Sequence, residues 1–184
     1  MPRYEAYTLK GWEEQGITRV VVMRTRDGGG LETGVFLVDT FCLGVKDAFL
    51  AEIPEADWPH QLNRMLPADE RIPLHPACAR KFVEGAVAYA EALGIAPHHD
   101  YKKARRAFGS VTASDCPETF TYGQDGKPFY IAGPNDDAAR VERVMRVLTA
   151  KLGPKGFHYL LPVDSEAPDD VVELDEARLR EALR

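Results

Sequence analysis

The stretch of sequence that decides the fold is residues 19–41, RVVVMRTRDGGGLETGVFLVDTF. It holds two apolar runs, at 19–24 and 34–41, that are rich in β-branched and aromatic side chains and are joined by the turn residues DGGG at 27–30. This pattern predicts a β-hairpin. Because neither run alternates strictly between apolar and polar residues, we expect both faces of both strands to be covered, with strand 33–41 central in its sheet.

The proline-free spans 3–53, 77–96 and 135–153 are where we expect long strands or helices, because proline lacks a backbone N–H and disfavours a helical residue before it. In the predicted helix at 77–93, Pro76 suits the first helical position and Gly94 ends the helix. Gly85, in its middle, indicates that another backbone passes close by. Asn135 is expected to cap the last helix. The predicted helices are 55–65, 77–93, 101–108 and 135–153.

Residues 118–122 and 128–131 flank Gln-Asp-Gly at 124–126 and predict a second hairpin, and 157–163 reads as a last short strand. Strands that occur in hairpins, instead of alternating regularly with helices, are typical of the α+β class. We therefore expect an antiparallel or mixed sheet built from two β-hairpins and a C-terminal strand, packed against about four helices.

The length of 184 residues and an apolar fraction of 45% fit one domain with a real core, and they exclude collagen-like and fully disordered chains. Of the net charge of −6, most comes from residues 164–184, which hold eight acidic and three basic side chains. We expect a domain over 3–163 and an acidic tail over 164–184, with a helix at 172–183.

Cys42, Cys78 and Cys116 lie 36 and 38 positions apart and include no CxxC pair. This spacing predicts neither a zinc finger nor a disulfide framework, so we expect reduced thiols and a cytoplasmic protein. No apolar stretch is long enough for a membrane span, and the first residues lack the apolar core of a signal peptide. No membrane partner is expected.

A resemblance to other proteins rests on four segments of the sequence: GVFLVDTFCLGVKDAF at 34–49, EGAVAYAEALGIAPHHDY at 84–101, YGQDGKPFYIAGPND at 122–136 and GFHYL at 156–160. With these segments the chain resembles an uncharacterised family of bacterial proteins without assigned activity. The resemblance covers most of residues 17–161. It implies a single domain, and it implies no mechanism.

The strongest candidate for catalysis is the end of the predicted central strand, where Asp39 is followed by Lys46 and Asp47. A carboxylate there can hold Mg²⁺ or Mn²⁺ or act as a base, and a lysine can neutralise phosphate charge. One interpretation is a metal-dependent hydrolase acting on a phosphoester, with Asp39 and Asp47 as metal ligands, Lys46 as charge stabiliser and His98 as general base. In the structural alternative, Asp39 satisfies backbone donors in a turn and Asp47 faces solvent on a short helix.

A second set of possible metal ligands comprises His75, Cys78, His98 and Asp100. Imidazole, thiolate and carboxylate groups all bind transition metals, but the spacing matches no zinc motif. The structural alternative is that His75 precedes one helix while Asp100 caps the next.

The basic cluster Lys102, Lys103, Arg105 and Arg106 follows Tyr101. Cationic side chains beside an aromatic ring can bind phosphates and stack on a base, which indicates RNA or DNA as a partner. The alternatives are a solvated helix face and a basic helix on which the acidic tail docks.

The leading functional prediction is a small binding module, without a cofactor, that contacts nucleic acid through the helix at 101–108 and the exposed parts of the second hairpin. Two alternatives stay open. One is the metal-dependent hydrolase, and the other is a protein-interaction domain that forms a homo-oligomer or a heteromer.

Overall fold

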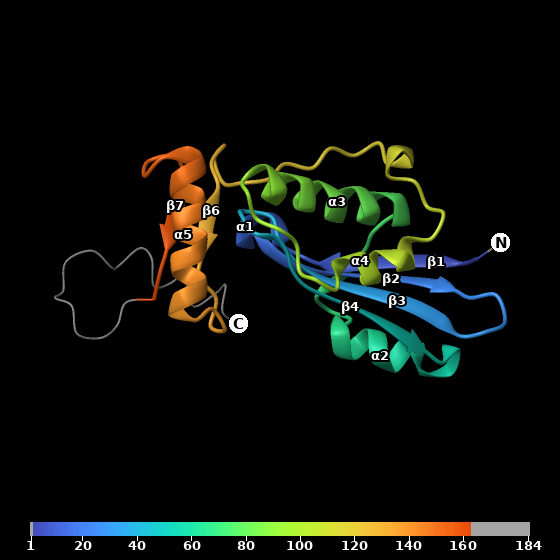
Figure 1. Ribbon diagram of the computed structural model, residues 1–184. Helices are drawn as coiled ribbons and strands as arrows, with labels where there is room; N and C mark the ends of the chain where they lie inside the picture. Colours follow the sequence, from blue (N-terminus) through green and yellow to red (C-terminus); the bar gives the residue numbers. More distant parts are fainter. Residues whose placement is uncertain (1, 163–184) are drawn as a thin grey trace.

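The centre of the protein is a five-stranded antiparallel sheet with strand order β4-β3-β2-β1-β5, seen in the computed structural model, which describes residues 2–162 (Figure 1). β2 and β3 pair along their whole length, from Ile17 with Asp39 to Thr25 with Leu31, which confirms the predicted hairpin. β3 lies between β4 and β2, and eight of its nine residues are buried. The strands are β1 (Tyr4–Leu9), β2 (Ile17–Thr25), β3 (Leu31–Asp39), β4 (Gly44–Ile53) and β5 (Arg71–Pro73).

Strand β4 corrects the expectation that Asp47 lies on a short helix, because Asp47 pairs with Leu37 of β3. The four strands β1 to β4 follow one another as a meander, so each buries its backbone polar groups against its sequence neighbour. The sheet therefore contains more of the N-terminal chain than one predicted hairpin.

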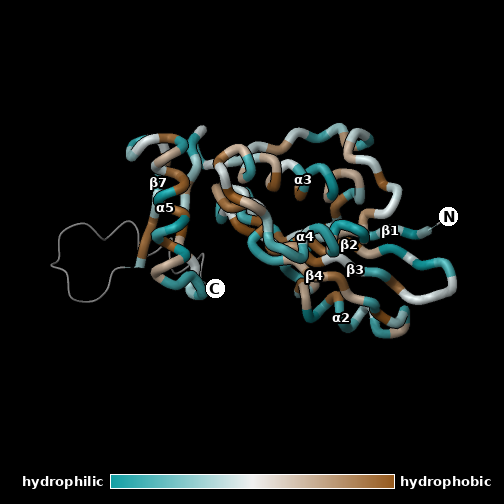
Figure 2. The backbone as a smooth tube through the Cα atoms, viewed as in Figure 1, coloured by the Kyte–Doolittle hydropathy of each residue, from teal (hydrophilic) through white to brown (hydrophobic). Residues whose placement is uncertain are grey.

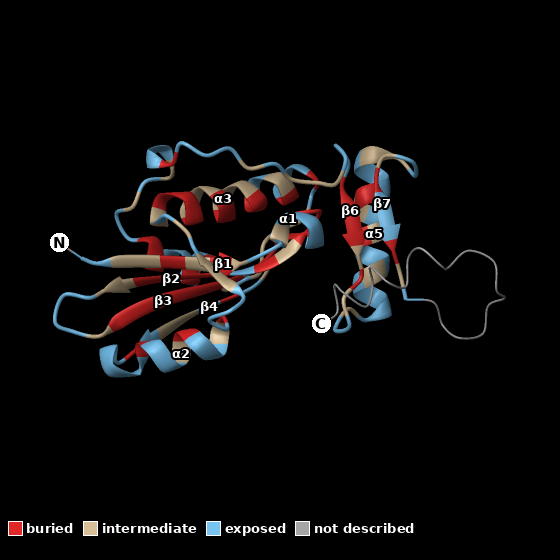
Figure 3. Ribbon diagram, turned by 180° about the vertical axis from the view of Figure 1, so that it is seen from behind, coloured by how far each residue is buried: buried red, intermediate tan, exposed pale blue. Residues whose placement is uncertain are grey.

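Helices cover both faces of this sheet (Figures 1 and 3). On one face lie α3 (Pro76–Ala92), α4 (Tyr101–Ala104) and the 3₁₀ turn η2 (Arg105–Phe108), and on the other lies α2 (Trp58–Met65). Hydrophobic residues follow the strands between these two layers (Figure 2). The predicted helices at 55–65, 77–93 and 101–108 are confirmed within a few residues.

Glycine allows two close approaches in this core. A Cβ atom on Gly34 would lie 2.7 Å from the carbonyl oxygen of Ala104, so α4 can rest directly on β3. A Cβ atom on Gly85 would lie 2.2 Å from the hydroxyl of Tyr122. The close approach expected at Gly85 is real, but it is made by a side chain and not by a backbone.

A smaller unit follows, in which the parallel strands β6 (Phe129–Ile131) and β7 (His158–Leu160) pack against α5 (Ala138–Leu152) (Figure 1). The predicted second hairpin is therefore wrong, because β6 pairs with β7 and residues 118–122 form no strand. The ring of Phe120 instead packs edge-on against Phe82 of α3, 5.1 Å away. The hydroxyl of Tyr122 donates a hydrogen bond to the carbonyl oxygen of Phe82 (2.9 Å).

The cap of α5 also differs from the prediction. Asp137, not Asn135, accepts the capping hydrogen bond, from the backbone N–H of Arg140 (2.7 Å). Over residues 2–162, no helix is both long enough and apolar enough to cross a membrane. The acidic segment 164–184 and its expected helix at 172–183 lie outside the described residues.

Cys78 and Cys116 form a disulfide, which contradicts the expectation of reduced thiols. The bond ties the first turn of α3 to the extended segment that runs back along that helix, with Cys42 left as a buried free thiol. Disulfides persist in oxidising compartments. The cysteines consequently no longer support the expected cytoplasmic location.

We predict that opening the Cys78–Cys116 bond lowers the free energy of unfolding by roughly 3–4 kcal/mol, since the bond closes a loop with a sequence separation of 38. Thermal unfolding with and without a phosphine reductant measures this effect. The double variant Cys78→Ala/Cys116→Ala is the control, and its melting temperature should not respond to the reductant. An equal response of both proteins would contradict the prediction.

The hydroxyl of Thr33 is the one buried side-chain polar atom of the described residues that has no hydrogen-bond partner. An unsatisfied buried hydroxyl costs about 1–3 kcal/mol, so Thr33→Val should raise the free energy of unfolding by about 1 kcal/mol. Thr18→Val is the matched control. It should destabilise the protein, because the Thr18 hydroxyl is bonded to that of Thr8 (2.8 Å) inside the same sheet. Urea unfolding of both variants tests this opposite sign.

Candidate functional site

A β-bulge in β4 determines where Lys46 lies. Leu37 of β3 pairs with Asp47, but the next residue, Val38, pairs with Val45, so Lys46 has no partner across the ladder. A bulge bends a strand and changes the direction of its side chains. As a result Lys46 and Asp47, which would point to opposite faces of a regular strand, line the same cavity.

This first cavity has a volume of about 360 Å³ and lies between the end of the main sheet and the smaller C-terminal unit. Its walls come from the short helix α1 (Trp12–Gln15) and its following residues, from the ends of β3 and β4, and from the loop 131–136. Its ionisable lining residues are Asp39, Lys46, Asp47, Asp136 and Arg140.

Asp39 organises the turn at the base of this cavity. Its Oδ1 atom accepts hydrogen bonds from the backbone N–H groups of Phe41 and Cys42, both at 2.9 Å. The carbonyl oxygens of that turn in turn accept from the C-terminal unit, Thr40 from Gly123 (2.8 Å) and Phe41 from Phe129 (3.0 Å). The structural interpretation of Asp39 is thus confirmed, and the turn it shapes joins the two parts of the protein.

Burial also changes the ionisation of Asp39, which is only 6% exposed. Desolvation raises the pKa of its carboxyl group to about 6, against the opposing effects of the Lys46 charge and the backbone N–H donors. Asp39 therefore exchanges a proton near neutral pH, inside a cavity that a small molecule can enter.

On the opposite wall, Asp136 and Arg140 form an ion pair with 2.9 Å between Oδ1 and Nε. The other oxygen of Asp136 accepts from the backbone N–H of Gly133 (2.9 Å) and from the hydroxyl of Tyr130 (3.4 Å). Neither residue of the ion pair was among the site residues predicted from the sequence. Only the helical spacing of four between them could have indicated the pair, and nothing in the sequence places it beside Lys46.

A second cavity, of about 440 Å³, adjoins the first, because Lys46 and Arg140 line both. Arg143, His98 and His99 complete its polar lining. Every ionisable group that lines it is a base, so this cavity suits an anion.

The structure brings together most of the predicted catalytic group. Nε2 of His98 lies 3.7 Å from Oδ1 of Asp47, and Lys46 is the neighbouring residue. Asp39 lines the first cavity and His98 the second, and neither residue lines both. Asp39 and Asp47 line one cavity, but Asp39 Oδ1 is already bound to two backbone donors, which leaves it poorly suited to the predicted metal-ligand role.

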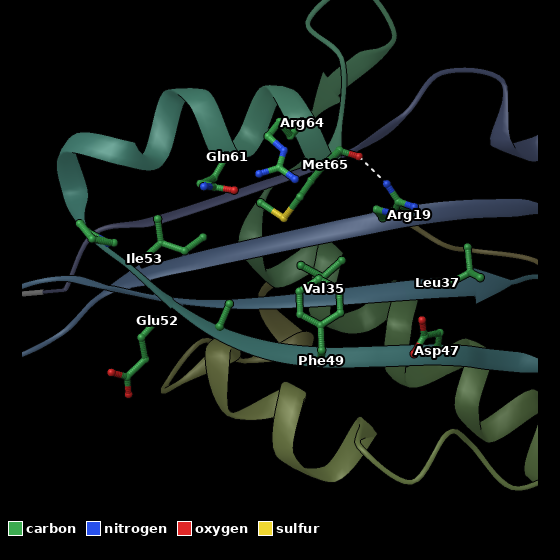
Figure 4. Close-up of a pocket in the computed structure, with 12 residues that line it drawn as sticks. Arg19, Val35, Leu37, Asp47, Phe49, Glu52, Ile53, Gln61, Arg64 and Met65 are labelled. Atoms are coloured by element: carbon green, nitrogen blue, oxygen red, sulfur yellow. Dashed lines mark hydrogen bonds between the residues drawn. The ribbon is translucent and has the colours of Figure 1, made fainter.

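A third cavity, of about 540 Å³, lies on the α2 face of β3 and β4 (Figure 4). Val35 and Phe49 form its floor, and Phe49 is 45% exposed. At one side Arg19 donates a hydrogen bond to the carbonyl oxygen of Met65 (2.7 Å) (Figure 4). The cavity shares Leu37 and Asp47 with the first cavity, so the two are neighbours along the sheet.

The predicted nucleic-acid surface differs from its expected form. Tyr101 is buried, with its ring centroid 6.2 Å from that of Phe36, so its predicted stacking on a base is wrong for this conformation. Arg105 pairs with Glu84 (3.1 Å). Arg106 pairs with the buried Glu32 (3.5 Å). Lys102 and Lys103 are exposed and form no ion pair within residues 2–162, so the cluster presents two unpaired lysines and no aromatic ring to solvent.

The second predicted metal set does not hold together, because His75 and Cys78 have other roles. Nδ1 of His75 accepts the capping hydrogen bond of α3 from the N–H of Ala77 (3.2 Å), which confirms its structural interpretation. Cys78 is in the disulfide. Asp100 makes no capping bond with its side chain and lies beside His99 instead, at 3.3 Å.

No family model, curated protein or solved structure matches this chain. The resemblance to an uncharacterised bacterial family stays an expectation. The function is therefore argued from the geometry of the cavities around Lys46.

We predict that Asp39→Asn stabilises the protein at pH 7 and has little effect at pH 4. The folded-state pKa of about 6 exceeds the ordinary value of 3.8, so ionisation of Asp39 opposes folding as the pH rises between these values. The asparagine keeps an acceptor oxygen for the turn and removes a cost on the order of 2–3 kcal/mol. Urea unfolding of both proteins at the two pH values measures it. An equal difference at both pH values would contradict the raised pKa.

Proposed function

We propose that this protein binds a small ligand with a phosphate group in the paired cavities beside Lys46. The observation that carries the proposal is the bulge in β4, which sets Lys46 between two cavities and opposite Arg140 of α5. Bulges often direct side chains at sites of function. Bases that surround a hollow concentrate the field there and attract an anion.

Two of the basic side chains that line the second cavity have no ion-pair partner within the described residues. Among residues 2–162, neither Lys46 nor Arg143 forms an ion pair, in contrast to the paired Arg105 and Arg106 of the predicted nucleic-acid surface. Arg140 uses its Nε atom for Asp136 and has further N–H donors. Three cations from two separate units of the fold therefore supply a bidentate and a point-charge contact, which suits phosphate.

The neighbouring cavity indicates the rest of the ligand. The third cavity, shown in Figure 4, has Val35 and Phe49 at its base and adjoins the first cavity at Leu37 and Asp47. A ligand with an apolar or aromatic body joined to a phosphate would use both environments.

Hydrolysis of a phosphoester is the second candidate, and the Asp47–His98 pair favours it. A carboxylate beside an imidazole can orient it as a general base. The nucleic-acid alternative stays a proposal, now resting on Lys102 and Lys103.

Phenyl phosphate is a suitable first probe, with benzyl alcohol as the uncharged comparison, and calorimetry or amide chemical shifts can follow binding. Phenyl phosphate should bind, and benzyl alcohol should not. Lys46→Ala should weaken phenyl phosphate binding by about 10-fold or more, because it removes one charged hydrogen bond to the phosphate. Lys102→Ala removes the same charge outside the cavities and is the matched control. Release of phenol by the wild type would show the hydrolase.

Two results would decide against the proposal. One is phenyl phosphate affinity that Lys46→Ala leaves unchanged. The other is salt-dependent binding of a single-stranded oligonucleotide that Lys102→Ala/Lys103→Ala abolishes and Lys46→Ala does not, which would assign the protein to nucleic acid.

A further inference from the structure

Two imidazoles and a carboxylate, those of His98, His99 and Asp100, gather beside the second cavity, and the carboxylate of Asp47 lies next to His98. Single ligand atoms of His98, His99 and Asp100 all lie within 4.8 Å of one another. His99 Nε2 is 3.3 Å from an oxygen of Asp100, and His98 Nε2 is 3.7 Å from an oxygen of Asp47. In a tetrahedral site with metal–ligand bonds near 2.0–2.1 Å, neighbouring ligand atoms are about 3.3–3.4 Å apart. The separation in the His99–Asp100 pair equals that value, and the separation in the His98–Asp47 pair is slightly longer.

The backbone holds this cluster in place. The N–H of His98 donates to the carbonyl oxygen of Val45 in β4 (2.9 Å), and the N–H of Tyr101 donates to the carbonyl oxygen of His98 (2.9 Å). The N–H of Ala104 donates to the carbonyl oxygen of Asp100 (2.8 Å). With the Tyr101 ring buried under the same loop, residues 98–100 are fastened to the start of β4, next to Asp47.

We propose that Asp47, His98, His99 and Asp100 form a binding site for a divalent metal ion of the zinc class. Imidazole nitrogen is a ligand that Zn²⁺ prefers, whereas Mg²⁺ and Mn²⁺ favour sites made of oxygen atoms. Of the two metal ligands predicted from the sequence, Asp47 belongs to this site and Asp39 does not. The other three proposed ligands are His98, His99 and Asp100. It does not depend on phosphate binding.

Metal binding requires Asp47 to approach His99 and Asp100, and it also changes the tautomer of His98. Nδ1 of His98 accepts a hydrogen bond from the N–H of Asp100 (3.2 Å), so the proton of the neutral ring is on Nε2, facing Asp47. A metal at Nε2 takes the place of that proton, which moves to Nδ1, and the contact with Asp100 is lost. The tautomer of His98 therefore reports on the bound metal.

Zinc titration of the full chain, prepared without a histidine tag, tests the site by calorimetry. One Zn²⁺ should bind per chain, and His99→Ala and Asp47→Asn should each weaken binding by at least about tenfold. His99 is suited to removal because its side chain is 82% exposed, so its loss leaves the core intact. His60→Ala removes an exposed histidine from α2 and should leave the affinity unchanged.

Nitrogen-15 NMR of the imidazole rings gives an independent measurement, in which Zn²⁺ should shift His98 from the Nε2–H to the Nδ1–H tautomer. Unchanged affinity in His99→Ala would overturn the proposal. So would half a Zn²⁺ per chain together with a dimer in sedimentation, or displacement of Zn²⁺ by an equal concentration of Mg²⁺. Loss of phenyl phosphate binding with intact Zn²⁺ binding would refute only the phosphate site.

Discussion

The hydrogen bonds that the buried carboxyl group of Asp39 accepts from the turn after β3 are the interaction on which the site depends. They fix the turn at 40–43, and this turn both starts β4 and accepts the main-chain bonds from Gly123 and Phe129 that attach the C-terminal unit. Lys46 enters the cavities from one side of this junction and Arg140 from the other. One carboxyl group thus has a structural role for both walls.

The sequence predicts the elements whose signals are local. The hairpin at 19–41 follows from aliphatic runs around a glycine turn, and α3 follows from apolar spacing between Pro76 and Gly94. β4 escaped prediction because its sequence GVKDAFLAEI mixes charged and apolar residues, as an edge strand with a bulge does. Phe120 and Tyr122 alternate with polar residues as in a strand, which is why a hairpin was predicted. In the structure both side chains pack on α3, and their segment does not pair with another strand.

The same distinction applies to the candidate site. Lys46, Asp47 and His98 were grouped from the sequence, and the structure places them together because the loop before α4 binds to Val45. Arg140 and Arg143 could not be foreseen, since the docking of α5 depends on contacts between segments about a hundred residues apart. The Cys78–Cys116 pairing has the same cause, because its two ends meet only after the intervening chain has folded back along α3.

The chain between Cys116 and β6 is attached to the rest of the protein at several separate points. The disulfide attaches Cys116 to α3, and the hydroxyl of Tyr122 is hydrogen-bonded to the same helix. The backbone N–H groups of Gly123 and Phe129 are bonded to the turn after β3. The bonds of Tyr122, Gly123 and Phe129 lie between Cys116 and α5 along the chain, so they stay in place when the disulfide opens only if the segment after Cys116 alone moves. The attachment of the C-terminal unit, which carries Arg140, therefore includes hydrogen bonds that do not involve the cysteines.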